Sequence, residues 1–351
     1  MTYQSPVQTS EFHPNTQAYF AGACVAVTGG SGFVGSHVVE QLLALGARVI
    51  VPSRQAPSPP FLAHLGDRID VRPCDFQHRS QARPGIDGAD VVMNLAASVA
   101  GIEYNATHPE TVFRDNMRTF LNVMEAALQV QARRFLVVSS ACIYPRHCLV
   151  PTPETEGFAD SPEPTNAGYG WAKRMEEYAA AAAVKEHGLE VAIARPYNAY
   201  GPRDNFNPVS SHVLPALILK ADETTDGTLP VWGDGTPTRS FLYVDDFARG
   251  LIEVTARYAA ADPINIGASE EVSIGTVAAM VAEIVGRRRG TAITPTFMPT
   301  SLTGQPRRDC DTTKLVSALG FQPNVGLREG LERSVSWFLE NRELALIAHH
   351  Q

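Results

Sequence analysis

The sequence predicts an α/β fold built on a doubly wound parallel sheet, with a smaller C-terminal lobe. Short apolar runs rich in β-branched residues alternate with helical stretches between residues 22 and 200. Beyond residue 200, Pro and Gly become frequent and the apolar runs become shorter and irregularly spaced. Because right-handed crossovers connect successive parallel strands, this alternation places helices on both faces of one sheet.

Each expected element rests on its length, its composition and the period of its apolar residues. The strands are short buried runs, and the helices repeat apolar residues at helical spacing; the first helix ends at a glycine. The expected strands are 24–29, 47–52, 69–73, 90–97, 133–140 and 190–196, and the expected helices are 36–46, 108–129 and 165–188.

The chain divides into three regions. Residues 1–21 are polar and are expected to form a tail that packs loosely on the body or on a partner. Residues 22–200 form the large sheet, and residues 201–345 mainly form the smaller lobe, with or without one return to the large sheet. Ligands in open α/β sheets bind beyond the carboxyl ends of the strands, so we expect the site in the cleft between the last two regions.

Composition excludes several classes of protein. The 351 residues include 44% hydrophobic ones, which argues against disorder, and the net charge of −8 argues against a nucleic-acid partner. No apolar run reaches about 18 residues and the N-terminus is polar, so we expect neither a membrane span nor a signal peptide. The five cysteines are sparse and no His/Cys cluster suggests a metal, so a reducing cytoplasm and no metal site are expected.

A glycine-rich turn follows the first expected strand and opens the first helix. It reads as GxxGxxG on Gly29, Gly32 and Gly35, or as GxGxxG when Gly30 is counted first. Such glycines allow a tight turn and close approach of a pyrophosphate to the N–H groups of the helix N-terminus. The pattern predicts that residues 22–200 are a dinucleotide-binding (Rossmann) domain. Further candidate cofactor residues are Phe33 and Val34 in the helix start, and Leu95, Ala96 and Ala97 at the end of the fourth strand.

The end of the second strand bears on the choice of dinucleotide. An NAD site usually has an acidic residue there, whereas this chain has Ser53 and Arg54, which suit a 2′-phosphate. We therefore expect NADP, with NAD as the alternative if Arg54 is only a solvated loop residue. Asp75 and Phe76 after the third strand could hold the adenine edge, or could simply end the strand.

A Tyr-x-x-x-Lys pattern lies in the last long helix. Tyr169 and Lys173 are four residues apart and share one helix face. A lysine ammonium near a phenol lowers its pKa from about 10, so that the tyrosine can exchange a proton with a carbonyl oxygen during hydride transfer. Ser140 ends the strand before that helix and brings a hydroxyl to the same edge of the sheet.

Together these motifs make the chain similar to the extended short-chain dehydrogenase/reductase superfamily, in particular its nucleotide-sugar epimerases and reductases. The resemblance covers about residues 22–342. It implies that Ser140, Tyr169 and Lys173 form the catalytic triad and that Gly29, Gly32 and Gly35 contact the pyrophosphate. It also implies that the C-terminal lobe binds a nucleotide diphosphate sugar and that the enzyme is a homodimer.

A thiol and an imidazole flank this triad in the sequence. Cys142 follows Ser140, and His212 lies in the loop after the strand that ends at 196. Hydrogens α to the carbonyl of a 4-keto sugar are acidic, and inverting such a carbon needs a base on one ring face and an acid on the other. A thiol and an imidazole both titrate near neutral pH and suit this exchange. The alternatives are a buried structural cysteine and a structural histidine.

The amino-acid sequences of several segments resemble those of the GDP-4-keto-6-deoxymannose 3,5-epimerase/4-reductases. The similar segments are CIYP (142–145), DNF (204–206) with SHV (211–213), WGDGTP (232–237) and WFLEN (337–341). The resemblance implies that Cys142 and His212 are the acid/base pair. It makes Trp232 a platform for the nucleotide, and Lys220 and Arg239 contacts of the diphosphate, roles that an indole and cations suit. Arg307 and Arg308 are weaker diphosphate candidates, and Asn198 is a candidate substrate contact.

The resulting hypothesis is an NADP-dependent nucleotide-sugar 3,5-epimerase/4-ketoreductase that acts on a GDP-4-keto-6-deoxyhexose. The alternative is a redox-neutral NAD-dependent epimerase, because Ala141 in SSACIYP resembles GDP-mannose 3,5-epimerases instead. A catalytically silent dinucleotide sensor is a third reading, against which the intact Ser140, Tyr169 and Lys173 argue.

Overall fold

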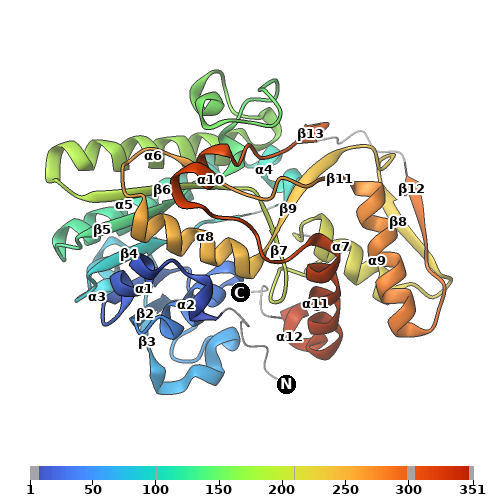
Figure 1. Cartoon of the computed structure of the whole chain (residues 1–351), viewed down its shortest axis with the longest axis horizontal. Helices are drawn as coiled ribbons and strands as arrows, with labels where there is room; N and C mark the ends of the chain where they lie inside the picture. Colours follow the sequence, from blue (N-terminus) through green and yellow to red (C-terminus); the bar gives the residue numbers. More distant parts are fainter. Residues whose placement is uncertain (1–7, 100, 209, 299–304, 348–351) are drawn as a thin grey trace.

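A seven-stranded parallel sheet forms the centre of the computed structural model, which describes residues 8–99, 101–208, 210–298 and 305–347 (Figure 1). The strand order is β10-β6-β5-β4-β1-β2-β3, and every neighbouring pair is parallel. The strands are β1 Cys24–Thr28, β2 Arg48–Ser53, β3 Ile69–Pro73, β4 Val91–Asn94, β5 Arg134–Val138, β6 Glu190–Pro196 and β10 Ile264–Ile266. This confirms the predicted fold class.

Helices cover both faces of this sheet, as the predicted alternation requires. Successive residues of β1 point to opposite sides, so Val25 and Val27 lie in one core while Ala26 lies in another. One face carries α1 Pro14–Phe20, α2 Phe33–Ala44 and α8 Val244–Arg257, and the other carries α3 Arg79–Ile86, α5 Pro109–Gln129 and α6 Ala167–His187.

The second part of the chain builds two small sheets beside the large one. Strands β7 Asn198–Tyr200, β9 Thr238–Tyr243, β11 Glu271–Ser273 and β13 Arg307–Arg308 form one, and β8 Thr228–Trp232 with β12 Thr294–Met298 forms the other. Their helices are α7 Val213–Glu223, α9 Ile274–Arg289, α11 Leu327–Glu340 and α12 Arg342–Ile347, whereas α10 Thr313–Leu319 packs on α8 and β10 of the large sheet. β10 belongs to the large sheet, whereas the domain boundary expected at residue 200 stays a prediction.

Short helical segments connect the main elements. They are η1 Thr9–Glu11, η2 Pro60–Arg68, η3 Ala141–Ile143, η4 Glu154–Phe158, η5 Pro164–Asn166 and α4 Ile102–Thr107. The strand expected at 90–97 is shorter and ends at Asn94. The Leu95 N–H is shared between the Thr28 carbonyl at 3.2 Å and the Thr28 hydroxyl at 3.1 Å, and the Ala96 N–H donates to the same hydroxyl at 3.1 Å.

The N-terminal segment is helical and docked on the body, which differs from the loose tail expected from its polarity. Its α1 packs along α8, where Glu253 accepts hydrogen bonds from the Thr16 hydroxyl at 2.6 Å and the His13 N–H at 2.8 Å. Phe12 and Phe20 are buried. Tyr19 packs against the same core. Sequence periodicity missed this segment because its few apolar side chains show no regular helical repeat.

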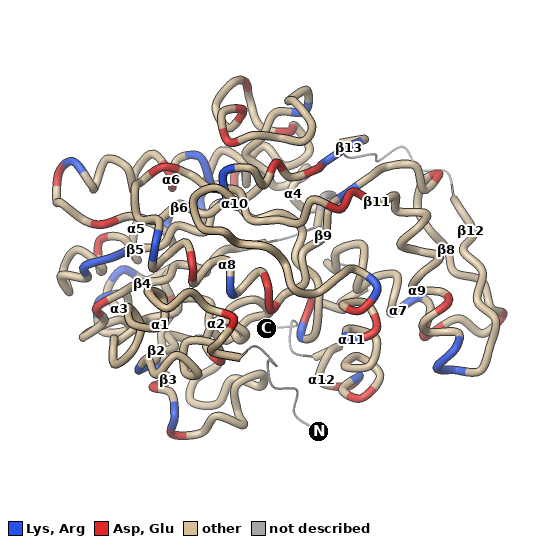
Figure 2. The backbone as a smooth tube through the Cα atoms, viewed as in Figure 1, with Lys and Arg blue, Asp and Glu red and all other residues tan. Residues whose placement is uncertain are grey.

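Charges of both signs are interspersed along the chain in the view of Figure 2, and no large region of one sign is visible there. No helix in the described part of the chain has the length and hydrophobicity that a membrane crossing needs.

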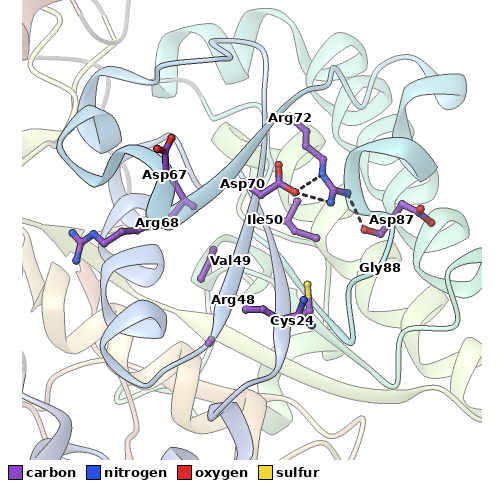
Figure 3. Close-up of a pocket in the computed structure, with 12 residues that line it drawn as sticks. Cys24, Arg48, Val49, Ile50, Asp67, Arg68, Asp70, Arg72, Asp87 and Gly88 are labelled. Atoms are coloured by element: carbon purple, nitrogen blue, oxygen red, sulfur yellow. Dashed lines mark hydrogen bonds and ion pairs between the residues drawn. The ribbon is translucent and has the colours of Figure 1, made fainter.

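A cavity of about 380 Å³ lies at the amino ends of β1–β3, where Arg72 pairs with Asp70 (Figure 3). It is at the sheet edge opposite to the glycine turn.

Replacing the anchor Phe20→Ala should lower the free energy of unfolding by about 3–5 kcal/mol, because it removes a fully buried ring. Denaturant unfolding measures this change. Asn15→Ala, on the exposed side of α1, should change it by no more than about 0.5 kcal/mol. Equal changes in the free energy of unfolding for the two variants would contradict the docking of α1 on the body.

Candidate active site

The glycine turn between β1 and α2 leaves no room for a side chain at its centre. Gly29 has φ +67°, and a Cβ on Gly35 would lie 2.1 Å from the Gly29 carbonyl oxygen. Helix α2 begins at Phe33, three residues earlier than expected, so the N–H groups of Phe33 and Val34 lie at its N-terminus. The turn thus has the shape that a pyrophosphate needs, and a dinucleotide fits it.

The end of β2 faces this turn. The Ser53 hydroxyl is buried and lies 3.1 Å from the Ser31 hydroxyl, while the adjacent Arg54 is exposed. A cation beside the glycine turn is placed to meet an anionic group on the ribose.

The other predicted cofactor residues lie at the carboxyl ends of β3 and β4. Leu95 and Ala96 contact the glycine turn, since a Cβ on Gly29 would lie 3.0 Å from the Ala96 nitrogen. Ala97 follows them. Asp75 caps the N–H of Gln77 and Phe76 is buried, so both have local structural roles and their contact with adenine stays a prediction.

Ser140, Tyr169 and Lys173 are brought together by β5 and α6. A side-chain hydrogen bond joins Tyr169 to Ser140, and the Lys173 ammonium lies 5.6 Å from the centre of the Tyr169 ring. The same ammonium donates to the Val138 carbonyl at 3.0 Å and to the Glu176 carboxylate at 2.9 Å. The three side chains therefore have the arrangement that the Tyr-x-x-x-Lys pattern predicts.

The pKa of Tyr169 differs from the sequence-based expectation. Burial raises it to about 12, although Lys173 and the hydrogen bond with Ser140 act to lower it. The expectation considered the ammonium alone and did not foresee the burial of the phenol or the charges of Cys142 and Glu176, which act in the opposite direction.

Cys142 lies in η3, directly after the triad serine. The Ser140 hydroxyl caps this turn by accepting the Cys142 N–H at 3.1 Å. Helix α6 comes so close that a Cβ on Gly170 would lie 2.6 Å from the Cys142 carbonyl oxygen. The thiol is therefore held next to Tyr169, and its charge would act on the pKa of that phenol.

Two arginines from neighbouring strands lie on the other side of Cys142. Arg308 of β13 is paired in register with Arg239 of β9, and its guanidinium is 3.9 Å from the Cys142 sulfur. Within the described residues neither arginine forms an ion pair with a carboxylate: Arg239 donates to the Thr238 carbonyl, and Arg308 donates to Gln305. Burial and the charge of Arg308 lower the pKa of Arg239 to about 10. Such a pair of cations is suited to an anion such as a diphosphate.

Asn198 is in the adjacent strand β7, which pairs with β9. Its side-chain amide donates to the Ser240 carbonyl at 2.8 Å. Arg307 differs from the other candidates, because its side chain pairs with Glu271 and is exposed. It is thus already neutralised, and it is a poorer candidate for a diphosphate than Arg308.

Lys220 and Trp232 face each other in the lobe. The Lys220 ammonium lies 4.7 Å from the centre of the indole, and partial burial lowers the pKa of this lysine. Trp232 is 71% exposed, and Met298 of the neighbouring strand is exposed beside it. The pair offers an open aromatic surface next to a cation, which suits a nucleotide.

His212 is the N-cap residue of α7. The residue keeps an exposed surface, yet the surrounding protein lowers the pKa of the imidazole, because it partly removes the water that would solvate the charged form. Among the interactions of the described residues none joins His212 to Cys142, so their position on opposite faces of one sugar stays a prediction.

Sequence reasoning missed two residues of this site. Gln305 donates to the Pro145 carbonyl at 2.9 Å and accepts from Arg308, and so fixes the arginine beside Cys142. Glu176 pairs with Lys173. The three-residue spacing of Lys173 and Glu176 was a signal that could have been used, whereas Gln305 meets its partner only in the fold.

Residues 25–267 match the family described as the NAD dependent epimerase/dehydratase family. The chain belongs to this family. It is 35% identical to a probable GDP-L-fucose synthase 1 of Oryza sativa over 91% of this chain and 93% of the relative. It is also 35% identical to GDP-L-fucose synthase 1 of Arabidopsis thaliana over 91% of this chain and 94% of the relative.

Solved structures agree with the fold. An epimerase from Methanothermobacter thermautotrophicus is similar with a TM-score of 0.84 and 27% identity, over 95% of this chain and 98% of the other. The resemblance inferred from the glycine turn and the Tyr-x-x-x-Lys pattern is thereby confirmed, as is the predicted enzyme class.

Proposed function

We propose that this protein is an NADP-dependent GDP-L-fucose synthase, which epimerises a GDP-4-keto-6-deoxyhexose at C3 and C5 and then reduces its C4 ketone. The observation that carries the proposal is the position of Cys142, which is held between the Ser140–Tyr169 pair and Arg308. A proton-transfer group and a ketone-binding group are therefore combined in one site. The GDP-L-fucose synthases among its relatives support the same substrate.

In this proposal Cys142 and His212 exchange protons at the ring carbons next to the ketone. The hydroxyls of Ser140 and Tyr169 donate hydrogen bonds to the C4 oxygen and stabilise the enolate that proton removal creates. Bound NADPH supplies the hydride for C4. Tyr169 then gives its proton to the C4 oxygen, and Lys173 orients the tyrosine.

Substrate binding follows from the charges and aromatic groups of the lobe. Arg239 and Arg308 bind the diphosphate, Lys220 supports it, and Trp232 stacks on the base. Asn198 lies in the strand next to Arg239 and contacts the sugar.

Deuterium exchange tests this function. With the 4-keto nucleotide sugar and NADPH in D2O, we expect ring deuterium at C3 and C5 together with stoichiometric loss of NADPH. Cys142→Ser should slow the labelling by about 10²-fold or more, because it removes one acid/base group. Mass spectrometry of the product and NADPH absorbance are the measurements.

Cys148→Ser is the matched control, since that thiol is also partly exposed and its hydrogen bond is with Thr152 and not with a triad residue. It should label the sugar at the wild-type rate. NADPH loss without ring deuterium would reduce the protein to a plain 4-ketoreductase. Ring deuterium with retained NAD and no net cofactor loss would instead establish the redox-neutral epimerase.

The proposed preference for NADP rests on Arg54 and Ser53 at the end of β2. Arg54→Ala should raise the KM for NADPH by about 10- to 100-fold, which corresponds to one charge-assisted interaction. The KM for NADH should stay unchanged. Arg68→Ala is the control, because Arg68 is exposed at the opposite sheet edge. Equal effects on both cofactors would contradict the role of Arg54.

A homodimer through α5 and α6 is part of the proposal. These helices pack side by side, and each presents apolar side chains along one line. Phe113 and Leu121 on α5 and Trp171 and Tyr178 on α6 are exposed, with the half-buried Met117 and Met175 between them. Spacings of three and four residues keep each set on one helix face. A second copy of this face, related by a twofold axis, would cover both sets.

A cytoplasmic location is proposed as well, because all five cysteines are free.

Leu121→Asp should convert the dimer to a monomer, because it places a charge in the proposed interface. Sedimentation velocity measures the mass. Val316→Asp on α10 also places a charge at an exposed apolar position, and it should leave the mass unchanged. A wild-type protein that sediments as a monomer would overturn this interface.

A further inference from the structure

Glu176 is a buried carboxylate one helical turn beyond the triad lysine. Its oxygen lies 2.9 Å from the Lys173 nitrogen, and both side chains are almost completely buried. Lys173 gives a second hydrogen to the Val138 carbonyl at 3.0 Å. Two of the three hydrogens on the ammonium are therefore directed into the protein, and the ammonium is fixed at the end of β5.

A carboxylate at this distance cancels much of the electric field of the ammonium. The field of Lys173 is what stabilises a negative charge on the nearby Tyr169, and Coulomb interactions are strong where water is excluded. Burial is the largest influence on the pKa of Tyr169 and raises it; Lys173 lowers this pKa, whereas the charges of Cys142 and Glu176 raise it. Burial also raises the pKa of Glu176, and the neighbouring Lys173 acts to lower it.

The other ionisable groups around this pair lie on α6, in the loop after β5 and on α5. On α6, Glu177 acts on both groups but is itself neutralised by two hydrogen bonds from Arg195. From the loop after β5, Cys142 faces Tyr169. The charged side chains of α5, which packs along α6, lie in solvent-accessible positions: Glu110, Arg114, Asp115, Arg118 and Glu125.

We propose that Glu176 is a positioning residue that neutralises the charge of Lys173 and thereby helps to keep Tyr169 as the phenol that donates a proton in ketone reduction. The inference rests on the proposed function and adds to it a residue that sets the pH range of the reduction. The two motif residues Tyr169 and Lys173 alone would favour the phenolate.

The proton balance shows where this role lies. In the reductive direction the Tyr169 O–H bond breaks, an O–H bond forms on the C4 oxygen, and the C4 carbon takes the hydride that bound NADPH would supply. The phenolate that remains takes a proton from water. A tyrosine that has already ionised cannot donate, so Glu176 extends proton donation to higher pH.

The test is the pH dependence of 4-ketone reduction by the wild type and by Glu176→Gln. The glutamine keeps a hydrogen-bond acceptor for Lys173 but removes the negative charge. The alkaline limb of kcat/KM, where the phenol is lost, should move down by about one pH unit or more. Glu176→Asp, which restores a carboxylate, should return the limb toward the wild-type position.

A second measurement does not need substrate or cofactor. The near-ultraviolet absorbance of phenolate, taken as a difference from a Tyr169→Phe variant in each background, follows Tyr169 alone. Tyr169 should ionise at lower pH in Glu176→Gln than in the wild type. Glu177→Gln is the control. It destabilises the protein because it leaves Arg195 without its carboxylate partner, but it should shift the pH at which Tyr169 ionises less than Glu176→Gln does.

The proposal is overturned if Tyr169 ionises at the same pH in the wild type and in folded Glu176→Gln, or if Glu177→Gln has the larger effect. Because the absorbance titration involves no turnover, it tests the role of Glu176 even if the deuterium experiment fails. Failure of the deuterium experiment bears on the proposed function alone.

Discussion

The guanidinium of Arg195 connects the segments on which the site depends. It donates two hydrogen bonds to the Glu177 carboxylate, one at 2.9 Å and one at 2.7 Å, and another to the Glu154 carbonyl at 2.6 Å. It also reaches the Tyr144 hydroxyl, which donates in turn to Asn265 of β10. Helix α6, the loop that follows Cys142 and the edge of the large sheet therefore share one buried cation. Burying these charges is costly unless every partner is in place, so the network favours a single arrangement of the three segments.

Unequal neutralisation of charge distinguishes the parts of the site. The ammonium of Lys173 is balanced within the protein by Glu176, and the guanidinium of Arg195 by Glu177. Arg239 and Arg308 have no such carboxylate partner among the described residues, although they lie in adjacent strands. The protein thus compensates the cations next to the triad and keeps its positive charge at the place where the proposed diphosphate binds.

The sequence was sufficient for those features that depend on local spacing. The glycine turn and the Tyr-x-x-x-Lys pattern lie within single elements, and strand alternation alone determines that the sheet is parallel. The docked N-terminal segment was not predictable, because its anchors Phe12 and Phe20 meet α8 only after the sheet has formed. Arg308 beside Cys142 was likewise not predictable as a contact, because the two are 166 positions apart and β13 is only two residues long. The expected lowering of the Tyr169 pKa by Lys173 is outweighed by burial, which raises this pKa. Burial is a tertiary property and was not predictable from the spacing of the two residues.

The path of the chain limits how the two sheet systems can move. The polypeptide passes from the large sheet to the small one after β6, returns through α8 to β10, and leaves again for β11. It comes back once more, since α10 packs on α8 and β10 before α11 joins the lobe. A hinge that opened the cleft would have to bend all these connections together. The two halves should therefore behave as one rigid frame, and a ligand would enter by rearrangement of surface loops instead of separation of the halves.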